Sequence, residues 1–385
     1  MADACRDLDD IARRPASVTT PDLSYVALAL VPGIGRARLD MLLAAFETAG
    51  AALAAPYRAL VRVPGISRAA ATAVTQASLA QAERVVEGTA RERGQVLLPS
   101  DARFPERLRT IPDAPTLLFA KGNLELLRKP TVAIVGSRSH TRYGAEVCRH
   151  FASGLARAGL MVASGMARGL DAVAHTATLD VGGGTVGVLG NGLGVIYPTA
   201  NRALYERVAQ DGCLLTEFPP GERPHAGSFP RRNRLISGLA RCTLVVEARE
   251  KSGALITVDC ALAQGREVLA VPGQITSPMS AGCNRLIQHG AKPALGLNDV
   301  LEEYGLAGAD AATLAVPRDL TPDERRILDA MALGVEHVDD LAQRLELAVA
   351  EVLAVLTSLE IRGLVTQEPG KIFHCAAGLP SLARS

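Results

Sequence analysis

The chain has 385 residues, of which 48% are hydrophobic and 21% are charged, and its formal net charge is +1. This length is enough for two or three domains, and this composition excludes an extensively disordered chain. The charge excludes a nucleic-acid partner held by the field of the whole molecule, so any such partner must meet local patches. The seven cysteines are widely spaced without a Cys-x-x-Cys pair, which excludes a recognisable zinc site and a disulfide framework.

The first 20 residues are polar and acidic, and we expect them to form a disordered tail. Arg13, Arg14 and Pro15 interrupt this segment, which excludes a signal peptide. No apolar run in the sequence approaches the roughly 18 residues that a membrane span needs. Together with the unpaired cysteines, this predicts a cytoplasmic protein that has no membrane partner.

Residues 21–98 contain an internal repeat that predicts a helical domain. Val-Pro-Gly-Ile-Gly-Arg-Ala at 31–37 recurs as Val-Pro-Gly-Ile-Ser-Arg-Ala at 63–69, and helical, alanine-rich stretches follow at 38–48 and 69–87. The glycines permit the positive φ of a tight turn between helices. The pattern resembles a helix-hairpin-helix (SAM-like) domain, whose loop amides can meet a phosphate. A helical bundle that merely uses the same turn is an alternative of equal weight.

Residues 99–309 alternate short apolar runs with glycine loops and helical segments. The apolar runs lie at residues 131–135, 160–163, 185–189, 242–246 and 268–271. Near-continuous β-branched runs that alternate with helices indicate parallel strands buried on both faces. We therefore expect an α/β domain with a Rossmann-like, doubly wound parallel sheet. Its glycine loops would share the edge at which such sheets bind ligands.

A linker at 310–320 precedes a predicted winged-helix domain at 321–377. Thr321 is a good N-cap, with proline at the first helical position. Three helices and a hairpin are expected at residues 322–331, 338–345, 349–362 and 364–374. Winged helices usually suggest DNA binding. The third helix carries Glu351, Glu360 and only Arg362, so we expect it to contact protein rather than the major groove.

The glycine loops lack the motifs of the common nucleotide enzymes. Gly-Ser-Arg-Ser-His at 136–140 lacks the second and third glycines of Gly-x-Gly-x-x-Gly, and no acidic residue is placed for a ribose. The sequence contains no Gly-x-x-x-x-Gly-Lys-Ser/Thr, no Gly-x-Ser-x-Gly and no metal-ligand spacing. We therefore expect no cofactor, no metal and no catalytic residues, so that the protein is not an enzyme.

Four of these loops carry small residues and cations that suit a phosphate backbone, because exposed amides and fixed positive charges bind anions. The DNA-binding residues predicted on these loops are Gly136, Ser137, Arg138, Ser164, Gly165, Arg168, Gly190, Asn191, Lys251, Ser252 and Gly253. Asp171 and His175 lie four residues apart, hence on one face of a helix. We expect them to orient their loop, with the aspartate accepting backbone amides, rather than to act as an acid and a base.

The segment with the most candidate nucleic-acid-binding side chains is Ser-Phe-Pro-Arg-Arg-Asn-Arg-Leu-Ile at 228–236. Its predicted DNA-binding residues are Phe229, Arg231, Arg232, Asn233 and Arg234. Arginines neutralise phosphates, and an aromatic face stacks on a base for about 1–3 kcal/mol. A solvated helix face is the alternative for such a charge run, but its place between a proline and an apolar stretch favours nucleic acid.

These motifs together resemble the DprA/Smf (DNA-processing protein A) family over about residues 105–300. The resemblance is carried by Val-Ala-Ile-Val-Gly-Ser-Arg, Ser-Gly-Met-Ala-Arg-Gly-Leu-Asp, Leu-Gly-Asn-Gly-Leu-Gly, Thr-Glu-Phe-Pro, Phe-Pro-Arg-Arg-Asn-Arg-Leu-Ile, Ser-Gly-Ala-Leu-Ile-Thr and Gly-Arg-Glu-Val-Leu-Ala-Val-Pro-Gly. The family's DNA-binding positions match Gly136, Ser137, Arg138, Phe229, Arg231, Asn233 and Arg234. Some members carry a basic residue shortly before Phe-Pro, where this chain has His-Ala-Gly-Ser. The positive charge must then come from Arg223, Lys251 or the arginine run.

The resemblance implies a cytoplasmic protein of competence, natural transformation and DNA recombination. Such a protein binds and protects incoming single-stranded DNA and helps to load the RecA recombinase onto it. Single-strand-binding protein is a further partner, and members commonly form homodimers. We expect the dimer contact in the segment 282–292, at Asn284, Leu286, Ile287 and His289. Two alternatives stay open: a phosphoribohydrolase-like nucleotide enzyme on the same fold, and a regulator that reads duplex DNA through the winged helix.

Overall fold

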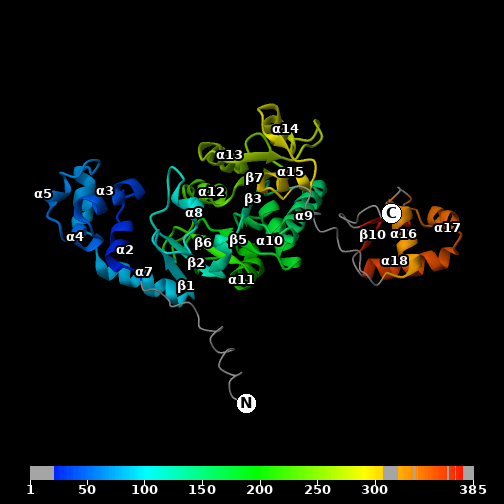
Figure 1. Cartoon of the computed structure of the whole chain (residues 1–385), viewed down its shortest axis with the longest axis horizontal. Coiled ribbons are helices and arrows are strands. Elements are labelled where there is room, and N and C mark those ends of the chain that lie inside the picture. The colour runs from blue at the N-terminus through cyan, green and yellow to red at the C-terminus, as the bar shows by residue number, and fades with distance from the viewer. Residues whose placement is uncertain are drawn as a thin grey trace, which may run out of the picture.

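A computed structural model describes residues 21–306, 320–332, 335, 337–361, 364–368 and 370–375. The expected tail at 1–20 and the expected linker, apart from its last residue, lie outside the described residues. Figure 1 shows the N-terminal helices, a central sheet with helices around it, and the C-terminal helices and hairpin. No helix in these described ranges combines the length and the apolar composition needed to cross a membrane.

The N-terminal part is helical, as the repeat predicts. Its helices are α2 (Leu23–Ala29), α3 (Arg36–Phe46), α4 (Ala49–Ala54), α5 (Tyr57–Leu60), α6 (Arg68–Thr75) and α7 (Leu79–Arg91). Gly33 and Gly65 occupy equivalent turns with φ of 82° and 79°. The Arg38 guanidinium joins the turns, because it donates to the carbonyl oxygens of Gly33 at 2.6 Å and Gly65 at 3.2 Å. The second alanine-rich stretch divides in two because Ser78 caps α7, its hydroxyl accepting from the Gln81 amide.

The central domain is built on a nine-stranded sheet with the order β1-β2-β6-β5-β4-β3-β7-β8-β9. Its strands are β1 (Gly94–Leu97), β2 (Leu118–Gly122), β3 (Thr131–Val135), β4 (Met161–Ser164), β5 (Thr185–Val188), β6 (Cys213–Thr216), β7 (Cys242–Val245), β8 (Glu267–Ala270) and β9 (Lys292–Pro293). Strands β3 to β9 pair in parallel, whereas β1 and β2 are antiparallel additions at one edge. The predicted α/β sheet is confirmed, and all five strands predicted from apolar runs belong to its parallel part.

Helices cover both faces of this sheet, which makes it doubly wound. One face is packed by α9 (Arg142–Arg157), α10 (Leu170–Asp180) and α11 (Arg202–Asp211), and the other by α12 (Ser228–Leu239), α13 (Gly253–Ala263) and α14 (Ala281–Gln288). The shorter helices are α8 (Glu106–Arg109), α15 (Leu297–Leu301) and the 3-10 turns η1 (Leu124–Arg128), η2 (Thr199–Asn201) and η3 (Glu302–Tyr304). The chain winds outward from β3 to β6 and then crosses back to β7. The switch point between β3 and β7 is where a ligand-binding crevice forms in such sheets.

The helical domain and the sheet share an apolar cluster. Val26 of α2 and Ala82 of α7 are buried together with Leu193 and Tyr205 of the central domain. Strand β1 precedes the expected domain boundary at residue 98 and pairs with β2 inside the sheet. The sheet therefore begins before that boundary.

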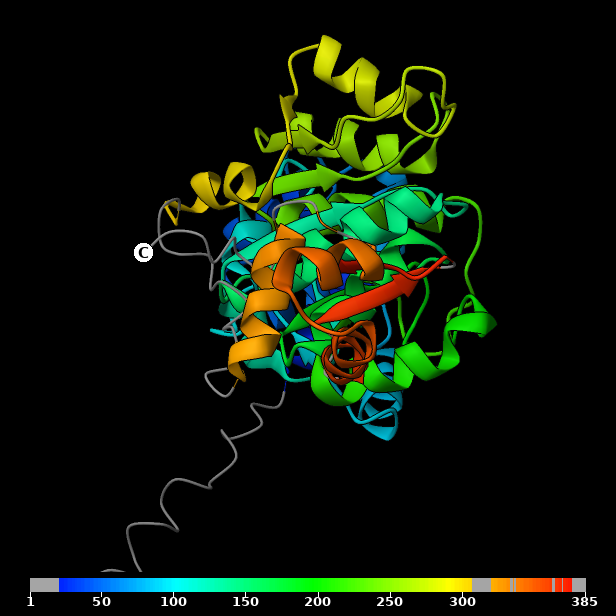
Figure 2. The same ribbon diagram turned by 90° about the vertical axis from the view of Figure 1, so that its right-hand side faces the viewer.

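The C-terminal part contains α16 (Pro322–Ala332), α17 (Val338–Leu345), α18 (Val349–Ile361), β10 (Val365–Glu368) and β11 (Ile372–Cys375). Figure 2 shows these three helices and the hairpin gathered into one unit, coloured orange to red. Thr321 caps α16 as predicted: its hydroxyl accepts from the Glu324 amide at 3.2 Å, and the Glu324 carboxylate accepts from the Thr321 amide at 2.8 Å. The winged-helix prediction is confirmed.

Candidate nucleic-acid interface

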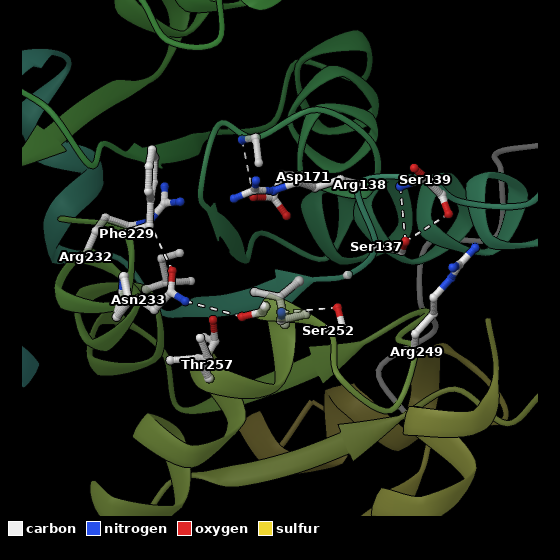
Figure 3. A pocket seen from close by; sticks show the side chains of 18 residues that line it. Ser137, Arg138, Ser139, Asp171, Phe229, Arg232, Asn233, Arg249, Ser252 and Thr257 are labelled. Carbon is white, nitrogen blue, oxygen red and sulfur yellow. Dashed lines mark hydrogen bonds between the residues drawn. The ribbon is translucent and has the colours of Figure 1, made fainter. Parts of the chain in front are cut away.

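A cavity of about 440 Å³ opens at the carboxyl edge of the parallel strands, at the switch point between β3 and β7. The loops after β3 and β7 form two of its walls, and the first turns of α10 and α12 form the others. The polar side chains that line it are Ser137, Arg138, Ser139, Asp171, Arg232, Asn233, Arg249, Ser252 and Thr257. Figure 3 shows these side chains around one common space. The predicted edge of the sheet therefore does carry a cavity.

Three helices begin at this cavity. Its lining includes Asp171 in the first turn of α10, Phe229 and Pro230 in the first turn of α12, and Ser252 and Gly253 at the start of α13. Each helix N-terminus carries a partial charge of about +0.5. Three such ends that meet at one cavity favour an anion without any side-chain charge.

Arg232 forms the inner wall of the cavity and is only 4% exposed. Its guanidinium donates hydrogen bonds to the carbonyl oxygens of Gly165 and Val188. Burial lowers the pKa of Arg232 to about 10, while the nearby Asp171 carboxylate opposes that change. Gly165 must lack a side chain, because a Cβ there would lie 2.6 Å from the Arg232 Nη1 atom. Arg232 therefore joins the loop after β4 to the end of β5 and is not an exposed phosphate ligand.

Asp171 accepts a backbone amide of the loop before α10, as the sequence predicts, and His175 contacts the start of β5. The Ala167 amide donates to Asp171 Oδ2 at 3.3 Å, and His175 Nδ1 lies 2.7 Å from the hydroxyl of Thr185. Burial, followed by the charge of Arg232, lowers the pKa of His175 to about 3. This imidazole is therefore neutral at physiological pH and has no role as a general acid there.

A smaller cavity of about 160 Å³ shares Phe229, Arg138, Ala167 and Arg232 with the main cavity, and Tyr197 lines the smaller one. The ring centroids of Tyr197 and Phe229 are 5.5 Å apart, and Tyr197 is 47% exposed. The Arg138 guanidinium lies 5.8 Å from the centroid of the Phe229 ring, within reach of a cation–π interaction. The two cavities thus combine an exposed cation with aromatic faces, which is the combination that stacked bases and phosphates need.

The arginine run divides between two sides of α12. Arg234 donates to Glu217 at 2.6 Å and to Asp113 at 3.0 Å, and it is buried at 9% exposure. Arg231 is exposed, lies 3.5 Å from Glu217 and packs over the ring of Phe218. Successive helical residues point about 100° apart, so four consecutive side chains cannot face one cavity. Only Arg232 and Asn233 of this run line the cavities.

Most of the predicted loop residues do come together. The predicted residues that line at least one of the two cavities are Gly136, Ser137, Arg138, Gly165, Arg168, Gly190, Asn191, Phe229, Arg232, Asn233, Ser252 and Gly253. Those that line neither cavity are Ser164, Arg231, Arg234 and Lys251. Ser164 is buried and its hydroxyl donates to the Ile134 carbonyl oxygen, while Lys251 is exposed outside both cavities. Arg223, named as a source of positive charge, is likewise exposed and lines neither.

Sequence reasoning missed two residues of the interface. Arg249 is exposed, lines the main cavity and contacts the Met279 sulfur with its Nε atom at 3.0 Å. Its position just after the predicted strand 242–246, on the edge of the sheet where ligands bind, could have identified it. Tyr197, whose ring lies beside that of Phe229, was not among the predicted residues. Arg138 and Arg249 are thus the exposed arginines of the main cavity.

The segment expected to form a dimer contact lies on α14 and just after it. The Asn284 side chain is occupied within the chain, because its amide exchanges hydrogen bonds with the backbone of Gly273 at 3.0 and 3.1 Å. Leu286 and Ile287 are half-buried against the core, and His289 is exposed. No group of three or more His, Cys, Asp or Glu side chains within the described ranges could hold a metal ion.

The sequence matches the family described as DNA recombination-mediator protein A over residues 95–305 and the DprA winged helix domain over residues 311–371. It is also 34% identical to Protein Smf of Synechocystis over 90% of this chain and 96% of that protein. The chain belongs to the DprA family. The DNA processing protein DprA of Streptococcus pneumoniae is 47% identical over 53% of this chain and 72% of its own length.

Two solved DprA structures resemble the fold. The X-ray structure of DprA from Streptococcus pneumoniae matches with a TM-score of 0.65 and 35% identity, over 74% of this chain and 98% of that one. DprA from Helicobacter pylori, whose structure is described as revealing a single-stranded DNA binding mode, matches with a TM-score of 0.51 and 28% identity over 55% and 95%. Both matches support the family assignment.

Proposed function

We propose that this DprA-family chain binds single-stranded DNA at the carboxyl edge of its sheet, in DNA processing during natural transformation, and without covalent chemistry. The observation that carries the proposal is the cavity in which three helix N-termini meet beside Arg138, Arg249 and the Tyr197–Phe229 pair. The helix ends and arginines suit phosphates, and the rings suit unstacked bases. The single-stranded DNA binding described for the Helicobacter pylori relative supports the same function.

A single strand fits this site better than a duplex. In a duplex the bases are stacked inside and offer a protein only their edges in the grooves. Phe229 and Tyr197 offer ring faces, which a base can use only when it leaves the stack. The described part of α18, the third helix of the winged-helix domain, carries no Lys or Arg and exposes Glu351 and Glu360. That helix therefore adds nothing to attract a duplex.

The experiment that tests the site is a salt series of binding to oligothymidylate. Arg138→Ala combined with Arg249→Ala should weaken binding and flatten the plot of log affinity against log salt. Each lost phosphate contact lowers the slope by about 0.7 for a single strand. The matched control is Arg84→Ala combined with Arg149→Ala, which removes the same charge from exposed positions outside both cavities. Equal slopes for both variants would show that DNA binds at another place on the chain.

We further propose a cytoplasmic role with partner proteins, which the family resemblance supports. The chain protects the bound strand from nucleases and helps to load RecA onto it, with single-strand-binding protein as a competitor that must be displaced. Strand exchange by RecA on covered single strands should therefore start sooner when the chain is added. The Arg138→Ala, Arg249→Ala variant should lose that effect together with DNA affinity. A variant that loses affinity but still accelerates exchange would contradict DNA-dependent loading.

The homodimer is proposed to form through α14. Leu286 and Ile287 expose part of their apolar surface there, and exposed His289 follows the helix. Leu286→Glu combined with Ile287→Glu should convert a dimer into a folded monomer in sedimentation equilibrium. A wild-type monomer, or a variant that stays dimeric, would contradict this contact.

Release of base from AMP by the folded protein would overturn the proposal of no covalent chemistry.

A further inference from the structure

A basic cavity of about 560 Å³ lies at the opposite edge of the sheet, where the parallel strands begin. Thr131 at the start of β3, Leu160 before β4 and Arg241 before β7 all line it. The residues of β3 separate this cavity from the carboxyl edge by roughly 15 Å, at about 3.3 Å per residue. The two cavities have no lining residue in common.

Five cationic side chains line this second cavity, and they come from three different segments. They are Arg107, Arg109, Arg128, Lys129 and Arg241. Glu106 is the sole carboxylate among the lining residues. The C-terminal end of α12 also reaches the cavity through Leu239 and brings a partial charge of about −0.5. The local balance is therefore strongly positive, although the net charge of the whole chain is +1.

The positive charge of this cavity is largely uncompensated inside the protein. Arg128 meets Glu125 at 3.7 Å, but both side chains are more than 60% exposed, so this ion pair contributes little. Lys129 and Arg241 are exposed and make no ion pair within the residues that the structure describes. Arg109 donates to the backbone carbonyl oxygen of Asp101 at 2.8 Å, which does not neutralise its charge. Side chains of one sign that surround a cavity, with one exposed ion pair among them, favour an anion from outside the chain.

A neighbouring arginine, Arg266, lies close to Arg107 of this cavity. Arg266 donates to the backbone carbonyl oxygen of Arg107 at 3.4 Å, and its buried Nε atom has no hydrogen-bond partner in the described structure. Burial lowers the pKa of Arg266, and the positive charge of Arg107 lowers it further. Positive charge is therefore also crowded next to this cavity, around Arg107.

We propose that this basic cavity is a second binding site for single-stranded DNA, which holds the phosphates of a distant part of the same strand. The cavity has no pair of aromatic rings: Phe104 is 2% exposed, and Tyr304 is half-buried with its hydroxyl donating to the Thr131 carbonyl oxygen. It therefore binds the backbone without reading or stacking bases. This inference rests on the proposed function, and it predicts that a long strand contacts both edges of the sheet.

The test compares two lengths of oligothymidylate on the full chain. One has about eight nucleotides, enough for one site, and the other is several times longer. Lys129→Glu combined with Arg241→Glu should leave affinity for the short strand unchanged. It should weaken binding of the long strand and lower its salt slope by about 1.4, which corresponds to two phosphate contacts. Both residues are exposed, so the thermal midpoint should stay the same, and Lys129→Ala with Arg241→Ala should give a smaller effect in the same direction.

The control is Arg84→Glu combined with Arg149→Glu, which makes the same change of net charge outside the two cavities. A long-strand loss that is equal in both pairs would show a general charge effect and overturn the second site. Unchanged binding of the long strand by the Lys129, Arg241 variant would also overturn it, while the proposed function would stand. A wild-type chain that binds neither strand would overturn the proposed function itself.

Discussion

The two edges of the parallel sheet collect positive charge in different ways. At the carboxyl edge three helix N-termini and two exposed arginines surround a cavity that also has aromatic faces. At the opposite edge the charge belongs to side chains alone, and no exposed aromatic lines the cavity. This difference shows that the fold and the particular residues contribute separately to the positive potential at the edges of the sheet. A doubly wound sheet creates an anion site at its carboxyl edge through helix direction, whereas the other edge becomes basic only through its particular residues.

A second contrast exists at the carboxyl edge itself, between arginines of α12 that are bonded inside the protein and an arginine that is free for a ligand. Arg232 and Arg234 are buried and bonded to internal carbonyl or carboxylate oxygens. Arg138, from a different loop, is exposed beside Phe229. Substitution of the buried arginines should therefore lower the free energy of unfolding, whereas substitution of the exposed Arg138 should lower the affinity for DNA.

The largest effect is expected for Arg234→Ala. Removal of this guanidinium leaves Glu217, whose side chain is 4% exposed, without its closest ion-pair partner. Breaking a buried pair in this way costs about 3–5 kcal/mol of the free energy of unfolding. Denaturant unfolding measures the loss. Arg231→Ala is the matched control, because Arg231 meets the same carboxylate from a 56% exposed position and should cost less than about 1 kcal/mol.

The cost of Arg234→Ala should also depend on pH. Burial raises the pKa of Glu217 above its ordinary value of 4.5, and Arg234 opposes that rise. A raised pKa means that the stability contribution of this group is complete at low pH and is lost as pH rises through the folded value. Without Arg234 the pKa rises further, so the gap between wild type and variant should widen from acidic to neutral pH. A gap that is constant over this range would show that the charge of Glu217 is not the cause.

A smaller effect, on affinity and not on stability, is expected for Phe229→Leu. Leucine keeps an apolar side chain beside Gly190 but has no ring face for a base, and base–aromatic stacking contributes about 1–3 kcal/mol. Affinity for oligothymidylate should therefore fall by about 5-fold to 150-fold. Phe229→Trp is the control and should keep most of the affinity. An equal loss in both variants would indicate a role of Phe229 in packing.

The sequence predicted the sheet well because its parallel strands are continuous apolar runs. It missed β6, a Cys-Leu-Leu-Thr run without Val or Ile and without a glycine loop directly after it, and the two-residue strand β9. It also missed β1 and β2, which join the edge antiparallel. The binding edge followed from strand direction, so Gly136 and Ser252 could be placed without a structure. The arginine run could not be divided in the same way, because the burial of Arg234 depends on Glu217 and Asp113, which are distant in sequence.

The smallest effect is expected at the winged-helix domain. Deletion of residues 318–385 should leave the affinity for single strands within about twofold, because none of the described residues of that domain lines either cavity of the interface. Isothermal titration with oligothymidylate measures this. A large loss of affinity, or the loss of a duplex preference on deletion, would instead support a regulator that reads duplex DNA.

The most direct measurement is a gel shift of the full chain with homopolymer single strands and with duplex across a salt series. We predict tighter binding of the single strand at each salt concentration, with a salt slope that falls by about 1.4 in the Arg138→Ala, Arg249→Ala variant, because two phosphate contacts are lost. Equal or tighter binding of duplex, together with an unchanged slope in that variant, would contradict a single-strand site at the carboxyl edge.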